Sequence, residues 1–190
     1  MTVTDLDTRS NVDLDEDWGI PLVSNRLLDL VEANMTNHGD SDYVRLDFMG
    51  EEHKVPFRRF DDEVEFVYRS GHCAFLALAI HEMTGLNFAV FTLPHSTKNS
   101  WSGHVAIETG PDEYLDICGT STEADINRVY GYGPGTGRAP MELITASTLS
   151  EIPYPLFLPP VAGQPWTLLG ELEELITRDY AKIVVRYCLR

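Results

Sequence analysis

Apolar side chains recur at helical spacing in three stretches of the chain, and each stretch is predicted to form a helix. The first, 21–38, contains a candidate N-cap at Ser24. The second, 73–83, is apolar nearly all round and is therefore predicted to be a buried helix. The third, 166–187, has one continuous apolar face. The residues of this face are Leu168, Leu169, Leu172, Leu175, Ile176, Tyr180, Ile183, Val184 and Tyr187.

Shorter runs that alternate, or that are rich in β-branched and aromatic residues, are predicted to be strands. Two of them flank Gly50 and form a first hairpin, and two others flank the turn 110–112 and form a second. An apolar run between the hairpins is predicted to be a central strand, and 64–68 to be a further extended piece. The predicted strands are 43–49, 53–57, 87–93, 104–109 and 113–118.

The remaining segments complete the predicted organisation. Residues 120–130 form a short helix, and five prolines in 152–165 predict an extended crossing. The glycine-rich stretch 131–140 lacks the preceding strand and following helix that a phosphate-binding loop needs. Together the elements predict an α+β fold, in which a small antiparallel sheet of four to six strands packs against the buried helix that carries Cys73.

Composition and charge limit the partners of the protein. The chain has 190 residues, 43% of them hydrophobic, which suits a single domain, predicted over 18–190. Residues 1–17 are acidic and poor in large apolar groups, so a disordered tail is predicted there. With 30 acidic and 14 basic residues, the net charge is −16. Such a surface repels nucleic acid and anionic membranes, and neither is expected as a partner.

Cysteine usage and the first residues indicate the compartment. Three cysteines far apart in the chain do not form a disulfide framework, which favours a reducing environment. The first residues show no basic region followed by an apolar one, and no apolar run approaches the roughly 20 residues that span a bilayer. We therefore expect a soluble cytoplasmic protein.

Three side chains with the chemistry of a thiol-based active site lie on predicted helices and strands. Cys73 begins the buried helix, His104 opens a strand, and Asp116 lies on the next strand. A thiol attacks as its thiolate, which a helix N-terminus and a nearby imidazolium both stabilise. His104 can return the proton to the leaving group, and Asp116 can orient the imidazole. Alternation along the hairpin puts His104 and Asp116 on one face, where they can meet across the strands.

Other groups near Cys73 complete the predicted site. Its backbone N–H is the first oxyanion donor, and His72 and Tyr68 are within chain reach as a second donor or a substrate contact. Trp101, in the polar loop before His104, is predicted to line a substrate groove. The chain has no Cys-x-x-Cys pair and no histidine pair at i, i+4, so no metal site is predicted and no cofactor is expected.

The motifs around these residues resemble those of a known superfamily. Gly71-His72-Cys73 heads an alanine-rich helix, and Gly103-His104-Val105 and Tyr114-Leu115-Asp116 follow on strands. This order is similar to the core of papain-like and transglutaminase-like cysteine enzymes. The separations look most like the transglutaminase-like branch, which includes bacterial peptidases and amidases. The resemblance covers about residues 66–120 and implies a triad of nucleophile, base and orienting acid in chain order.

The predicted function is a cysteine-dependent amide-bond hydrolase or acyl transferase, of the peptidase, amidase or deamidase type. Its substrate would be a peptide or protein amide, and its intermediate a thioester. Either water or an amine can resolve that thioester, so hydrolysis and transfer both stay open. The alternative is a catalytically silent protein on the same fold that acts as an interaction partner or an inhibitor.

Overall fold

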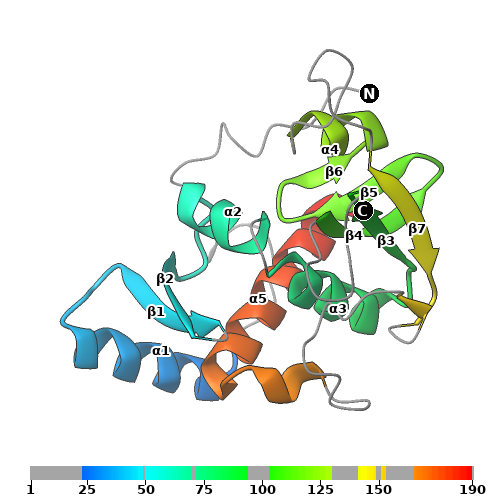
Figure 1. Ribbon diagram of the computed structural model, residues 1–190. Coiled ribbons are helices and arrows are strands. Elements are labelled where there is room, and N and C mark those ends of the chain that lie inside the picture. The colour runs from blue at the N-terminus through cyan, green and yellow to red at the C-terminus, as the bar shows by residue number, and fades with distance from the viewer. Residues whose placement is uncertain are drawn as a thin grey trace.

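A computed structural model shows an α+β fold in which five α-helices and seven antiparallel strands are formed by the described residues (Figure 1). The predicted tail, the loop that carries Trp101, the glycine-rich stretch 131–140 and most of the proline-rich crossing lie outside these residues. The described residues are 23–48, 50–69, 72–93, 103–129, 141–148, 151–152 and 165–189.

The first part of the chain is a helix followed by a hairpin, as predicted. Helix α1 (Asn25–His38) begins after Ser24, whose hydroxyl accepts a hydrogen bond from the backbone N–H of Leu27 at 3.2 Å. Strands β1 (Tyr43–Phe48) and β2 (Glu51–Pro56) pair in antiparallel register and form a sheet of their own.

The predicted extended piece at 64–68 is wrong, because the segment is helix α2 (Asp62–Arg69). Asp61 caps this helix, since its Oδ1 accepts a hydrogen bond from the backbone N–H of Val64 at 3.2 Å. Three acidic side chains in the first turn suit the positive end of the helix dipole. The buried positions also have helical spacing, and they are Val64, Val67 and Tyr68.

The second sheet has five antiparallel strands in the order β6-β5-β4-β3-β7, which agrees with the predicted sheet of four to six strands. The central strand and the second hairpin were expected from the sequence, whereas β6 and β7 were not. The short β6 follows a turn at Ile117 and Cys118, and β7 pairs with β3 across a long connection. The bounds are β3 (Phe88–Thr92), β4 (Gly103–Gly110), β5 (Glu113–Asp116), β6 (Gly119–Ser121) and β7 (Glu142–Ala146).

Three further helices complete the described structure. Helix α3 (Cys73–Thr84) is buried along its first eight residues, as its apolar sequence predicts. Helix α4 (Glu123–Val129) is short, as expected. Helix α5 (Glu171–Cys188) starts five residues later than the pattern predicted, because Gly170 is extended and separates it from a short 3₁₀ turn.

Helix α5 lies between the two parts of the fold (Figure 1). It contacts α1 and β1 on one side and α3 and β6 on the other. The predicted apolar face supplies four of its buried side chains, which are Ile176, Tyr180, Ile183 and Val184. Through these contacts α5 fixes the position of α3, whose first residue is Cys73.

Candidate active site

Cys73 is the first residue of α3, and its side chain is 2% exposed. The carbonyl of His72 accepts hydrogen bonds from the backbone N–H groups of Phe75 and Leu76, which starts the helix one residue before the thiol. At this position the backbone N–H of Cys73 has no carbonyl partner within the helix. The thiol therefore lies at the positive end of the helix dipole.

His104 lies on β4 opposite Phe91 of β3 and is fully buried. Its Nε2 donates a hydrogen bond to Oδ2 of Asp116 at 2.8 Å. Because Nε2 is used in this way, Nδ1 is the ring nitrogen left for another partner.

Asp116 ends β5 and is held at both carboxylate oxygens. Oδ2 accepts from His104, and Oδ1 accepts from the backbone N–H of Cys118 at 2.8 Å. The register pairs Ile107 with Leu115, so the next step sets Asp116 across from Ala106 and diagonal to His104. The expected meeting of the two side chains across the hairpin is thus observed.

The structure also brings the thiol to the imidazole. Burial by itself would lower the pKa of His104, but hydrogen bonds to Asp116 and to Cys73, with the charges of the same two groups, outweigh it and raise the pKa to about 9. The imidazole is therefore protonated at neutral pH. The imidazole is hydrogen-bonded to the carboxylate of Asp116, and the thiol of Cys73 lies close enough to interact with the imidazole.

The three predicted substrate contacts have different outcomes. Tyr68 is fully buried, and its hydroxyl hydrogen-bonds to Oγ1 of Thr177 at 2.9 Å, so it is a core residue in this structure. His72 is 6% exposed and stacks on Phe48 with ring centroids 4.2 Å apart. Trp101 lies outside the described residues.

Sequence reasoning missed two sets of groups near the thiol. One is the backbone N–H of Cys118, which donates a hydrogen bond to Asp116. Such a bond depends on the geometry of the turn, so the residue types alone do not predict it. The other is the pair Glu51 and His53, which lies beside His72. The sequence put Glu51 in the turn of the first hairpin and His53 at the start of the next strand, whereas β2 begins at Glu51, so the two side chains share a face. Nothing in the sequence connected that face to His72.

Comparisons with protein families, with curated proteins and with solved structures found no match. Among the described residues, no helix combines the length and the apolar character needed to cross a membrane.

Proposed function

We propose that this protein is a cysteine-dependent enzyme that attacks amide or peptide carbonyls with the thiolate of Cys73, on a papain-like or transglutaminase-like core. The observation that carries the proposal is the buried hydrogen bond from His104 to Asp116, with the thiol of Cys73 beside the imidazole at the start of α3. A nucleophile, a base and an orienting acid are the parts that thiol catalysis uses.

In the proposed first step, Sγ of Cys73 forms a bond to the carbonyl carbon and the carbonyl oxygen takes up negative charge. The backbone N–H of Cys73 donates a hydrogen bond to that oxygen. The imidazolium of His104 then passes its proton to the leaving amine as the C–N bond breaks, which leaves a thioester on Cys73. Water or an amine, deprotonated by His104, attacks the thioester and frees the thiol.

Asp116 contributes to this reaction through His104. Its carboxylate is fixed at both oxygens, so it holds Nε2 of His104 and leaves Nδ1 as the nitrogen for acid–base work. Its negative charge also favours the imidazolium form of His104.

One observation favours the alternative of a silent interaction or inhibitor protein. The side chain of Cys73 is 2% exposed and that of His104 is fully buried. A substrate reaches the sulfur only if neighbouring segments move. Reactivity of the thiol in solution therefore separates the two proposals.

The first test labels the protein with iodoacetamide near neutral pH and follows each cysteine by mass spectrometry. If the protein is a cysteine-dependent enzyme, we expect Cys73 to react before the other cysteines. Cys188 is the internal reference, because burial and the charge of Asp116 raise its pKa to about 11 and hold it as a thiol. Labelling of Cys73 no faster than that of Cys188 contradicts the enzyme proposal.

The second test uses a peptide-based thiol probe and a peptide amide library on the full chain. We expect His104→Ala to lower kcat/KM by roughly 10²–10⁴ through loss of the acid–base group, and Cys73→Ala to remove turnover. Cys118→Ser is the matched control and should keep full activity. Turnover that survives Cys73→Ala would show that the reaction takes place elsewhere.

A further inference from the structure

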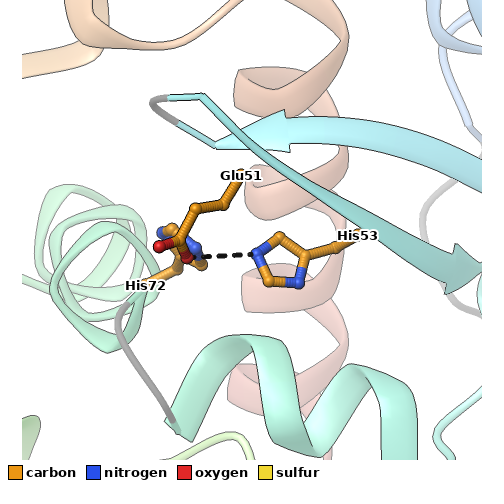
Figure 2. Close-up of side chains that lie close together, drawn as sticks. All are labelled: Glu51, His53 and His72. Atoms are coloured by element: carbon orange, nitrogen blue, oxygen red, sulfur yellow. Dashed lines mark ion pairs between the residues drawn. The ribbon is translucent and has the colours of Figure 1, made fainter.

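A second cluster of ligand-type side chains lies beside the start of α3 (Figure 2). Glu51 and His53 are two residues apart on β2, so they project from one face of the strand toward His72. One ligand atom from each of the three residues lies within 4.8 Å of the other two. Segments distant in the chain thus bring together two imidazoles and a carboxylate.

The two imidazoles each have a buried nitrogen without a hydrogen-bond partner. These atoms are Nε2 of His53 and Nδ1 of His72. The side chain of His72 is 94% buried and is fixed by stacking on Phe48, and the His53 ring stands edge-on to it with centroids 5.3 Å apart. Since buried polar atoms nearly always have a partner, two such nitrogens on neighbouring rings of one cluster indicate a missing ligand.

The charge state of the cluster suits a cation. A neutral imidazole offers a cation one nitrogen lone pair, and the cluster holds two imidazoles. Glu51 supplies a negative charge, and its side chain is 78% exposed, which gives an ion a path from solvent.

The distances suit a small ion of the transition-metal class. Nε2 of His53 lies 3.8 Å from Oε2 of Glu51. Two ligands about 2.1 Å from a shared Zn²⁺ ion stand about 3.4 Å apart at a tetrahedral angle. The Glu51 side chain is exposed, so rotation about its bonds can shorten its distance to His53 toward that value.

We propose that Glu51, His53 and His72 bind a Zn²⁺ ion, with water completing the tetrahedral shell. Two nitrogen ligands favour Zn²⁺ over Mg²⁺ or Ca²⁺, which prefer oxygen. The ion connects β2 to the N-terminus of α3 and leaves one position open for a ligand. This site uses none of the atoms assigned to catalysis, so it does not depend on the function proposed for Cys73.

The test is calorimetric titration of the full chain with Zn²⁺ alone, followed by thermal unfolding with and without the ion. We expect one ion per chain, and a higher unfolding temperature in its presence. His53→Gln and Glu51→Gln should each weaken binding at least about tenfold and reduce the thermal shift. Both positions retain solvent contact, so these variants are expected to fold, and circular dichroism checks that they do.

Three controls make the outcome decisive. Glu52→Gln removes a neighbouring exposed charge and His38→Gln an exposed imidazole, so both should bind like the unaltered chain. Cys73→Ser should also retain binding; an equal loss there would make the thiol a ligand and overturn the assignment. Absence of stoichiometric Zn²⁺ binding, or unchanged affinity in His53→Gln and Glu51→Gln, would likewise refute the site.

Discussion

His104 is the residue on which the electrostatics of the candidate active site depend. It is fully buried, and burial alone favours the neutral ring. The hydrogen bond to Asp116 and the interaction with Cys73 together reverse that preference and raise the pKa of His104 to about 9. The folded protein therefore holds a proton in its interior over a pH range in which a free histidine has lost it.

This proton predicts a specific dependence of stability on pH. The pKa of His104 is about 9 in the folded chain and about 6.5 in the unfolded chain, so its stabilising effect is complete below pH 6.5 and is lost as pH rises through 9. A difference of about 2.5 pKa units corresponds to at most about 3 kcal/mol. Urea unfolding at pH 6.5 and pH 9 should show the unfolding free energy falling across this interval.

Asp116→Asn is the variant that tests the origin of this dependence. The amide keeps the side-chain shape but removes the charge, so the pKa of His104 should fall and the loss of stability between pH 6.5 and 9 should shrink. His72 does not interfere, because its pKa is lowered to about 4 and it titrates on the acidic side. An unchanged slope in Asp116→Asn would show that the carboxylate does not hold the proton.

At the scale of elements, helix α2 is the segment that immediately precedes the candidate site in the chain. It ends at Arg69, shortly before Cys73, and packs against both β2 and α3. Its cap lies one residue outside it, at Asp61. We therefore expect a substitution at Asp61 to affect the candidate site only by changing the stability of α2.

We predict that Asp61→Ala lowers the free energy of unfolding by about 1 kcal/mol, because the backbone N–H of Val64 loses its acceptor. Asp61→Asn should cost much less, since asparagine is an equally good N-cap. Chemical denaturation of both variants measures the difference. Equal losses in the two would indicate that the charge of Asp61, and not its capping bond, is what matters.

At the scale of the whole molecule, α5 connects the hairpin side of the fold to the sheet side. Asp179 pairs with Arg58 at 2.9 Å, and the Tyr180 hydroxyl donates to the backbone carbonyl of Pro56. Thr177 bonds to Tyr68 of α2 in the same region. These buried polar contacts fix α5 in one orientation, because leaving such groups unpaired in the interior is unfavourable.

We predict that Tyr68→Phe destabilises the protein by roughly 1–3 kcal/mol, because it removes the partner of a buried hydroxyl at Thr177. The double variant Tyr68→Phe with Thr177→Val should recover part of this loss, since both polar groups are then gone. Thermal unfolding of these two variants and of the single variant Thr177→Val gives the coupling. Probe labelling of Cys73 should be unaffected; a specific loss of labelling would restore Tyr68 as a substrate contact.

The sequence by itself determined the features that depend on neighbours along the chain. Apolar spacing and end residues predicted α1 and α3, and alternation with a tight turn predicted the hairpin that sets His104 beside Asp116. Local patterns suffice here because helix caps and hairpin registers are fixed within a few residues.

The tertiary structure alone decided what depends on distant segments. It converted the expected extended piece into α2, paired β7 with β3, and enclosed Tyr68 in the core. It also brought His53 to His72, which are separated by a turn and a helix in the chain. Neither the hydrophobic period nor the spacing of residues along the chain predicts such proximity. It results from the packing of whole helices and strands around a shared core.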